Sequence, residues 1–248
     1  MGRRIIVCHL YPDFMNLYGD RGNVIVLQRR CQWHGLEPEL VERSLADRGG
    51  FSGYDIIFMG GGQDKEQRAI CADFQHMKGE ALKEAVEDDV PLLAICGAYQ
   101  LLGNYFRTAQ GEELPGTGLF DAWTVAGSKR LIGNVVVKSD LSGQERTLVG
   151  FENHSGQTFL GQGVRPLGTV VKGSGNNGSD RTEGAVYRHA IGTYLHGSVL
   201  PKNPWLADYL IGQALVRRYG EAGLRTLDDE LEERAHRAAI KRTGETTP

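Results

Sequence analysis

The run from Val90 to Ile95 is the feature that most constrains the fold of this 248-residue chain. It is short and apolar throughout, with no alternation of apolar and polar residues. Strands buried on both faces of a parallel sheet have this pattern. Comparable short runs occur at Arg4–His9 and Tyr54–Met59, and a helical stretch follows each of them. We therefore predict an α/β fold in which helices cover both faces of a mostly parallel sheet.

The remaining elements of the first half fit this reading. Glu39–Glu42, just after Pro38, is predicted to be a further short strand. The expected helices are Val24–Trp33, Glu66–Glu87 and, much later in the chain, Trp205–Tyr219, which Pro204 opens at an early helical position.

After Gly118 the pattern changes to short alternating runs, which are typical of antiparallel strands with one exposed face. We expect these runs to add antiparallel strands to the same sheet. They are Trp123–Val125, Leu131–Lys138, Thr147–Phe151, Thr169–Lys172, Ala185–Tyr187 and Ile191–Leu195.

The expected organisation is one domain over residues 1–220 and a charged tail over residues 221–248. In the tail, opposite charges stand four residues apart, as in Glu230 with Arg234 and Glu233 with Arg237. This spacing favours a helix whose charged face lies in water. A docking surface for another protein is the alternative interpretation of the tail.

Charge and cysteine content exclude several classes of protein. Lys and Arg number 28 against 31 Asp and Glu, so the net charge of −3 does not favour nucleic acid or an anionic membrane as a partner. No apolar run approaches the roughly 18 residues of a membrane span. The four cysteines form no C-x-x-C pair, which argues against a zinc site or a disulfide framework. We expect a cytoplasmic protein without a metal site.

Cys96 follows the buried run directly, and a helical stretch with small residues begins at once, in Pro91-Leu-Leu-Ala-Ile-Cys96-Gly97-Ala98. Such a strand-to-helix elbow can present a nucleophile in a tight turn. The N-terminus of the helix favours the thiolate form of a cysteine placed there. A buried structural cysteine at the end of a strand is the alternative.

Two other segments complete a candidate nucleophilic site. Gly60–Gly62 follows a strand and can turn backbone N–H groups toward an oxyanion, together with the N–H of Gly97, although three glycines also suit a plain turn. His196 ends the apolar run from Ala190 and is the histidine best placed to act as a general base. A cysteine and a histidine that are distant in sequence but both at strand ends fit a Cys–His site.

Three ordered segments carry a family resemblance: Cys96-Gly-Ala-Tyr-Gln-Leu-Leu-Gly103, Gly150-Phe-Glu-Asn-His-Ser-Gly156 and Gly192-Thr-Tyr-Leu-His-Gly197. Together they resemble the cobyric acid synthase type of class I glutamine amidotransferase. Leu17–Asn23 and Leu195–Pro204 are similar to the amidotransferase subunits of lipid II isoglutaminyl synthases. The resemblance extends over about residues 4–215 and implies the three-layer, flavodoxin-like fold of class I amidotransferases, with antiparallel additions to a mostly parallel sheet.

The resemblance also implies roles for individual residues. The Cys96 thiolate would attack the glutamine carboxamide, and N–H groups near Gly62 and Gly97 would hold the oxyanion. His196 would protonate the departing ammonia and then activate water. Arg130 would grip the α-carboxylate of glutamine, a task that suits a guanidinium.

Gln100 is a further substrate-binding residue that the family motif implies. The subunit itself would need no cofactor. Its partner would be a MurT-like synthetase of the Mur-ligase type, forming a heterodimer with it and using ATP and Mg to activate D-glutamate in the stem peptide of lipid II.

The sequence departs from the wider family at two places. No glutamate stands two residues after His196, where Ser198 is found, so the sequence shows no third member of a triad there. We expect a Cys–His dyad that an acidic side chain of the partner completes. Ala98 replaces the glycine of the Gly-x-Cys-x-Gly nucleophile pattern, and alanine is small enough to keep the elbow.

Two other functions remain open at this point. The first is an amidotransferase for another acceptor, such as cobyrinic acid. Those enzymes usually carry the synthetase on the same chain, and this sequence contains no G-x-x-x-x-G-K-[ST] loop. The second is a non-catalytic module that binds glutamine for regulation, against which the presence of both Cys96 and His196 argues.

Overall fold

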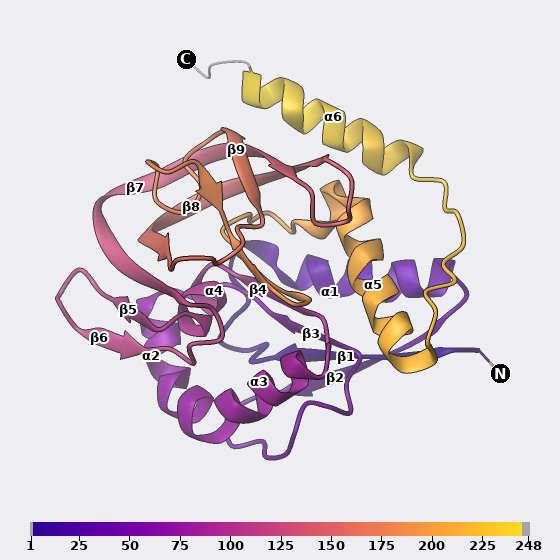
Figure 1. Ribbon diagram of the computed structural model, residues 1–248, viewed down its shortest axis with the longest axis horizontal. Coiled ribbons are helices and arrows are strands. Elements are labelled where there is room, and N and C mark those ends of the chain that lie inside the picture. Colours follow the sequence, from indigo (N-terminus) through magenta and orange to yellow (C-terminus); the bar gives the residue numbers. More distant parts are fainter. Residues whose placement is uncertain (1, 245–248) are drawn as a thin grey trace.

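The computed structural model describes residues 2–244 and confirms an α/β fold, with a central sheet between two layers of helices (Figure 1). In this part of the chain the central sheet has six strands, in the order β11-β12-β4-β3-β1-β2. Their bounds are β1 Arg4–Leu10, β2 Glu37–Arg43, β3 Ile56–Met59, β4 Leu92–Ile95, β11 Ala185–Tyr187 and β12 Ala190–Thr193.

All neighbouring strands of the central sheet are parallel except β11, which runs antiparallel to β12. With β12 as the fifth parallel strand, the order is the 2-1-3-4-5 order of flavodoxin-like folds. In such sheets ligands bind outside the carboxyl ends of the strands, next to the point where the strand order reverses. The topology therefore directs attention to the ends of β1, β3 and β4.

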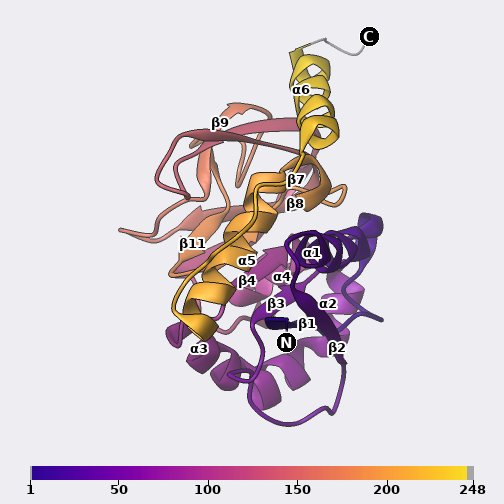
Figure 2. The same cartoon turned by 90° about the vertical axis from the view of Figure 1, so that its right-hand side faces the viewer.

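Helices cover both faces of this sheet (Figures 1 and 2). On one face α1 (Arg21–Trp33) and α5 (Pro204–Tyr219) pack through residues such as Leu27 and Leu210 against Ile5 and Phe58. The other face is covered by α2 (Asp64–Asp73), a π-helical turn (Phe74–Lys78), α3 (Gly79–Glu87) and α4 (Gly97–Leu102).

The stretch expected as one helix over Glu66–Glu87 is divided by the π-helical turn, and the reason is a buried ion pair. The ammonium group of Lys78, which is fully buried, donates to Asp73 at 2.5 Å. Residues five apart do not face each other on an α-helix, but the wider π-turn brings them to the same side. The ammonium group also lies 5.1 Å from the ring centre of Tyr11.

The alternating runs of the second half form a separate sheet, so the expectation that they all extend the first sheet is wrong. This sheet has the order β10-β9-β7-β5-β6, with β8 paired to β7. The strands are β5 Tyr105–Arg107, β6 Glu113–Pro115, β7 Ala122–Ser139, β8 Arg146–Leu160, β9 Gly168–Lys172 and β10 Thr182–Glu183. Only the run at Ala185–Tyr187 adds an antiparallel strand to the central sheet, and the run from Ile191 enters it as part of the parallel strand β12.

The long β7–β8 hairpin explains the difference. Its inner side chains, among them Val135, Val137 and Leu148, belong to the same hydrophobic core as the α1–α5 face of the central sheet. Apolar residues on one face of a second sheet alternate just as they do in an antiparallel extension of the first. The alternation therefore predicts a half-buried strand correctly but does not tell which sheet receives it.

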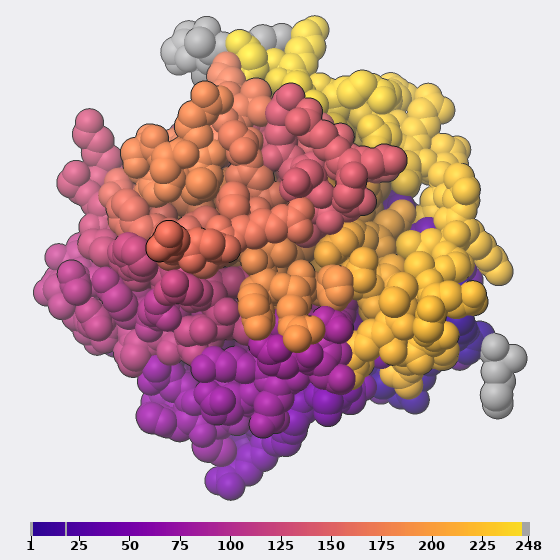
Figure 3. All heavy atoms as spheres, viewed as in Figure 1, coloured from indigo at the N-terminus to yellow at the C-terminus, as the bar shows by residue number. Residues whose placement is uncertain are grey.

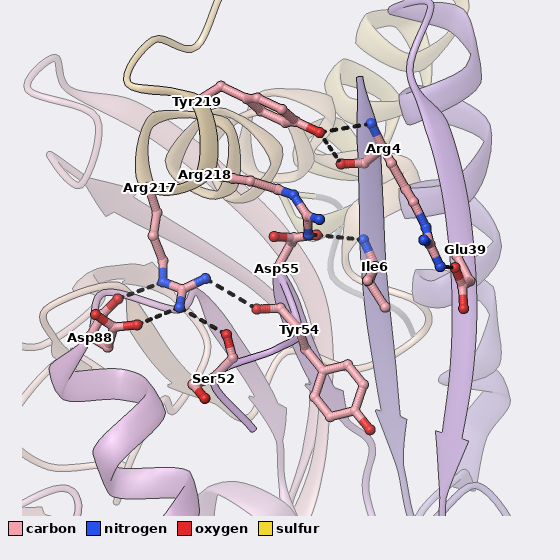
Figure 4. Close-up of polar contacts among 10 residues, drawn as sticks. All are labelled: Arg4, Ile6, Glu39, Ser52, Tyr54, Asp55, Asp88, Arg217, Arg218 and Tyr219. Atoms are coloured by element: carbon pink, nitrogen blue, oxygen red, sulfur yellow. Dashed lines mark hydrogen bonds and ion pairs between the residues drawn. The ribbon is translucent and has the colours of Figure 1, made fainter. Parts of the chain in front are cut away.

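Contacts at the C-terminal turn of α5 join this helix to the amino-terminal ends of strands in the central sheet (Figure 4). Arg217 donates to the backbone carbonyl of Asp88 at 2.6 Å, and Arg218 donates to the Asp55 carboxylate at 2.7 Å. That carboxylate also accepts the N–H of Ile6 at 2.7 Å. Figure 4 also shows contacts that join Arg217 to Ser52 and Tyr54, Tyr219 to Arg4, and Arg4 to Glu39.

The last helix, α6 (Glu230–Gly244), lies along the upper rim beside the β7–β8 hairpin (Figures 1 and 3). His236 fixes it there, through bonds of 2.7 Å to the Thr147 hydroxyl and to the Lys202 carbonyl. Most other α6 residues are exposed or half-buried, which agrees with the predicted solvated helix. The domain boundary at residue 220 stays a prediction.

Within residues 2–244, no helix combines the length and the apolar character needed to cross a membrane. The same part of the chain contains no group of three or more His, Cys, Asp or Glu residues placed to hold a metal ion.

Candidate active site

Cys96 stands at the carboxyl end of β4 and caps the N-terminus of α4, so the predicted strand-to-helix elbow is present. Its backbone has φ 50° and ψ −104°, a strained conformation for a residue with a side chain. Such strain is typically about 1–3 kcal/mol and is found mainly at functional sites. Thr193 of β12 holds the turn by accepting the Cys96 N–H at 2.8 Å. The Cys96 side chain remains partly accessible, whereas the other three cysteines are buried.

The glycines expected to form an oxyanion hole lie directly beside this turn. A methyl group on Gly97 would lie 2.4 Å from the carbonyl oxygen and 3.0 Å from the backbone nitrogen of Gly62. Only a residue without a side chain allows the two backbones to approach so closely. The N–H of Gly61 is used differently, because it donates to the Asp20 carboxylate at 2.6 Å.

His196 follows β12 and is held by a two-way backbone bridge to Phe151 of β8, with N–H to O distances of 2.8 and 3.2 Å. Its ring is almost completely buried. Burial alone would lower the pKa of His196, but the neighbouring Cys96 thiolate and the Asp20 carboxylate outweigh it and raise the pKa to about 10. The site therefore favours an imidazolium beside the cysteine.

The two side chains meet around Gly61. A methyl group built on that glycine would lie 3.0 Å from Cε1 of His196 and 3.5 Å from Cβ of Cys96. The structure thus brings the carboxyl ends of β3, β4 and β12 together at one point, as the topology of the sheet predicts.

Asp20 is the residue of this site that the sequence interpretation missed. It lies between the short 3-10 helix η1 (Leu17–Gly19) and α1, is fully buried, and places Oδ1 3.9 Å from Nδ1 of His196. The structure thus places an acid of this chain beside His196, whereas completion of the Cys–His pair by an acid of the partner stays a prediction. The acid is not at the familiar place two residues after the histidine but 176 residues before it, in Leu17–Asn23, which we noted for its resemblance alone.

A cavity of about 660 Å³ opens over this point, within the size range of small-molecule sites. Five of the six predicted site residues line it: Cys96, His196, Gly62, Gln100 and Arg130. Gly97, the sixth, lies directly behind Gly62. Sequence reasoning did not assign several other lining residues, among them Gln67, Asn153 and Ser155.

Comparison with known proteins identifies the family. The CobB/CobQ-like glutamine amidotransferase domain matches residues 6–204. The chain belongs to this family. This amidotransferase is 40% identical to the GatD subunit of lipid II isoglutaminyl synthase (glutamine-hydrolyzing) from Staphylococcus aureus over 238 residues, which cover 96% of each chain. It is 39% identical to the subunit of the same name from Streptococcus pneumoniae, over 87% of this chain and 82% of the other.

Solved structures agree with the fold of the amidotransferase. A chain of the PurLQS structure from Thermotoga maritima aligns with a TM-score of 0.56 over 99% of this chain and 100% of its own length. A glutamine amidotransferase from the same organism aligns with a TM-score of 0.51, over 98% of this chain and 99% of its own. Both are 17% identical in sequence, so these alignments show the class I amidotransferase fold alone.

Arg130 stands at the rim of the amidotransferase cavity, in an irregular part of β7 where the pairing with β8 shifts between Ala126 and Leu131. Its Nε donates to the side-chain carbonyl of Asn153 at 2.6 Å and Nη2 donates to the Asn153 backbone carbonyl at 3.2 Å. The irregularity directs an exposed guanidinium along the wall of the cavity. This placement is compatible with carboxylate binding, which stays a prediction.

The hydrogen bonds of Gln100 differ from those expected of a residue that binds substrate directly. Its amide nitrogen donates to the Tyr194 hydroxyl at 3.0 Å, and its oxygen accepts from Gln67 at 2.9 Å. Gln67 in turn donates to the Gly62 carbonyl at 3.2 Å. The Gln100 amide therefore supports the glycine loop through Gln67, and its assignment to substrate binding stays a prediction.

The second histidine of the cavity, His154, is held as a neutral ring. Its Nδ1 lies 2.7 Å from the Gly156 carbonyl, which can only accept, so this nitrogen carries the proton. The ring stacks on Tyr194 with 3.6 Å between centroids, and burial lowers the pKa of His154 to about 4. His154 thus lines the cavity as a neutral ring, whereas His196 is the histidine that pairs with the cysteine.

Proposed function

We propose that this amidotransferase hydrolyses L-glutamine and supplies the ammonia to a separate MurT-like synthetase. The acceptor we propose is the α-carboxyl group of D-glutamate in the stem peptide of lipid II, so that the product is D-isoglutamine and the pathway is peptidoglycan synthesis. One observation carries this proposal: the match to GatD of Staphylococcus aureus extends over 96% of both chains, and this chain holds Cys96 and His196 in one cavity.

The chemistry follows from the positions of the side chains. The Cys96 thiolate attacks the carboxamide carbon, and N–H groups at Gly62 and Gly97 stabilise the oxyanion. The imidazolium of His196 gives its proton to the departing nitrogen, so ammonia leaves and a glutamyl thioester forms. The neutral ring then takes a proton from water, and the resulting hydroxide attacks the thioester to release glutamate and restore the thiolate.

We assign binding of the amino-acid end of glutamine to the rim of the cavity. In the proposed complex the Arg130 guanidinium pairs with the α-carboxylate of the substrate. This contact keeps the carboxamide over Cys96, because the cavity connects the two residues. Correct orientation of a bound substrate contributes strongly to the rate of a subsequent attack.

The remaining chemistry belongs to the partner. In our proposal the Mur-ligase-type synthetase forms a heterodimer with this chain in the cytoplasm and uses ATP and Mg to activate the carboxyl group. The amidotransferase contributes no cofactor. Lipid II contacts the synthetase rather than this chain.

Cobyric acid synthases provide the contrasting case. The enzyme of that name from Pelotomaculum thermopropionicum is 29% identical over 74% of this chain, but the match covers only 37% of the longer synthase. This chain thus corresponds to one part of such an enzyme. The GatD match covers nearly the whole of both chains, which favours a separate subunit that works on lipid II.

The test is glutamine hydrolysis by the purified chain, alone and with the co-expressed synthetase, followed by mass analysis of lipid II. Cys96→Ala is the inactive variant, and Cys71→Ala, outside the cavity lining, is the matched control. We expect glutamate release and amidated lipid II with the wild type and Cys71→Ala, and neither product with Cys96→Ala. Hydrolysis without lipid II amidation would indicate another acceptor. No hydrolysis in either condition, with the synthetase bound, would indicate a non-catalytic module.

A further inference from the structure

Residues 17–23 run from η1 into the first turn of α1, and this loop segment is locked to the segment that carries the catalytic histidine. The Ser198 hydroxyl donates to the Gly19 carbonyl at 2.6 Å. The Asn23 side-chain oxygen accepts the N–H of Leu200 at 2.9 Å. The loop and the histidine segment are nearly 180 residues apart in sequence, and these bonds place them side by side at the cavity.

The centre of this contact is the carboxylate of Asp20, and its two oxygens have different surroundings. Oδ2 accepts the N–H of Gly61 at 2.6 Å. Oδ1 has no hydrogen-bond partner among the described side chains and backbone groups and lies 3.9 Å from Nδ1 of His196. A buried carboxylate is strongly unfavourable unless a cation or hydrogen bonds compensate it. The imidazolium of His196 is the cation that this oxygen faces.

We propose that Asp20 is the positioning residue of the glutaminase site, orienting His196 through Nδ1 and holding the oxyanion loop through Gly61. One carboxylate thus orients the ring of His196, the general acid–base, and fixes the position of Gly61 next to Gly62. The separation of 3.9 Å is an ion-pair distance, and hydrogen bonds of catalytic groups are often long before substrate binds.

This inference rests on the glutamine hydrolysis proposed above and is independent of the acceptor. The expectation that an acid of the synthetase completes the Cys–His pair stays a prediction. The positioning residue proposed here belongs to this chain.

Among the described side chains, Cys96, His154 and Glu183 also interact electrostatically with His196, and none of them fits this role. Cys96 is the nucleophile. His154 is neutral, because burial lowers its pKa to about 4. Glu183 of β10 directs Oε1 to the Thr193 hydroxyl at 2.6 Å and to the N–H of Tyr194 at 2.8 Å, and burial raises its pKa to about 7. Glu183 therefore holds the end of β12, not the ring.

The test compares Asp20→Asn and Asp20→Glu with Asp13→Asn, an exposed aspartate outside the cavity lining. We expect Asp20→Asn to lower kcat for glutamine by roughly 10²–10⁴-fold, the range that a positioned acid–base group contributes, with a KM change of less than about threefold. Asp20→Glu should recover part of kcat, and Asp13→Asn should equal the wild type.

A second readout does not need turnover. Imidazole NMR titration should show a lower pKa for His196 in Asp20→Asn than in the wild type, because the carboxylate stabilises the imidazolium. The basic limb of the kcat–pH profile should move to lower pH with it. An unchanged His196 titration, or wild-type kcat in Asp20→Asn, would overturn the inference. Equal losses of kcat in Asp20→Asn and Asp20→Glu, with the His196 titration unchanged, would show that Asp20 is only a structural anchor. The titration also separates this inference from the proposed function, since it reports on Asp20 even if glutamine is not hydrolysed.

Discussion

Replacing Gly97 with alanine tests whether the close approach of two backbones shapes this catalytic site. The added methyl group would lie 2.4 Å from the Gly62 carbonyl oxygen, which is about 1 Å shorter than an ordinary van der Waals contact distance. Neither atom belongs to a flexible side chain, so α4 and the glycine loop must separate by a comparable distance. Overpacking of this kind destabilises a protein by about 1–3 kcal/mol.

The effect on catalysis should exceed the effect on stability. A displacement of about 1 Å of groups that contact the reacting atoms can lower a rate about 100-fold. We therefore expect Gly97→Ala to lower kcat for glutamine hydrolysis by about 100-fold at a temperature where the variant is fully folded. The assay is glutamate release under saturating glutamine, with the free energy of unfolding measured by urea denaturation.

Gly133→Ala in β7 is the matched control, because a methyl group there would meet nothing within 4 Å. It should keep the wild-type kcat and change stability by less than about 1 kcal/mol. If folded Gly97→Ala hydrolysed glutamine at the wild-type rate, the assignment of the Gly62–Gly97 contact to the oxyanion site would be wrong.

Three further predictions concern other groups. Arg130→Lys should raise the KM for glutamine about 10-fold or more with kcat little changed, because an ammonium cannot make the bidentate contact of a guanidinium, and steady-state kinetics measure this. Arg30→Ala should lower the free energy of unfolding by about 3–5 kcal/mol in urea titrations, because it leaves the partly buried Asp208 and Asp229 without the buried guanidinium that pairs with both. In the wild type, burial raises the folded-state pKa of Glu183 to about 7 and so favours the protonated form. The free energy of unfolding should therefore fall as pH rises from about 4.5 to about 7. Glu183→Gln should remove this fall.

Each of these three predictions has its own control variant and its own contradicting result. Lys129→Ala, next to Arg130, should leave KM unchanged, and a fall in kcat alone for Arg130→Lys would contradict substrate binding. Arg29→Ala, on the exposed face of α1, should change stability by less than about 0.5 kcal/mol, and an equal effect of both arginines would contradict the ion-pair argument. For Glu183→Gln, a pH dependence of unfolding identical to that of the wild type would show that folding does not raise the pKa of Glu183.

Local sequence patterns were sufficient for the core of the fold. The unalternating run ending at Ile95, followed at once by Cys96 and small residues, predicts the strand, the tight turn and the helix start, because all three depend on neighbours in sequence. The positions of the glycine loop and of His196 at strand ends also follow from local patterns, but the strand before His196 was expected to be antiparallel and is the parallel strand β12.

What the patterns could not supply depends on tertiary contacts. The alternation in Leu131–Lys138 and Thr147–Phe151 does not distinguish a new sheet from an extension of the first, and only packing of the hairpin decides it. Asp20 was missed because its carboxylate meets His196 across 176 residues and no spacing rule connects the two. The polar contacts of Gln100 with Gln67 and Tyr194 depend on tertiary packing in the same way.

Isotope labelling shows whether the amide nitrogen of glutamine reaches lipid II. The amidotransferase and the proposed MurT-like synthetase would be incubated with ATP, lipid II and glutamine labelled with ¹⁵N in the side-chain amide. The stem peptide would then be examined by mass spectrometry. Our account predicts ¹⁵N in the D-isoglutamine of the product with the wild type and none with Cys96→Ala, and addition of free ammonia should restore amidation by the variant complex. Incorporation of ¹⁵N by the Cys96→Ala complex, or an unlabelled product from a wild type that hydrolyses glutamine, would contradict it.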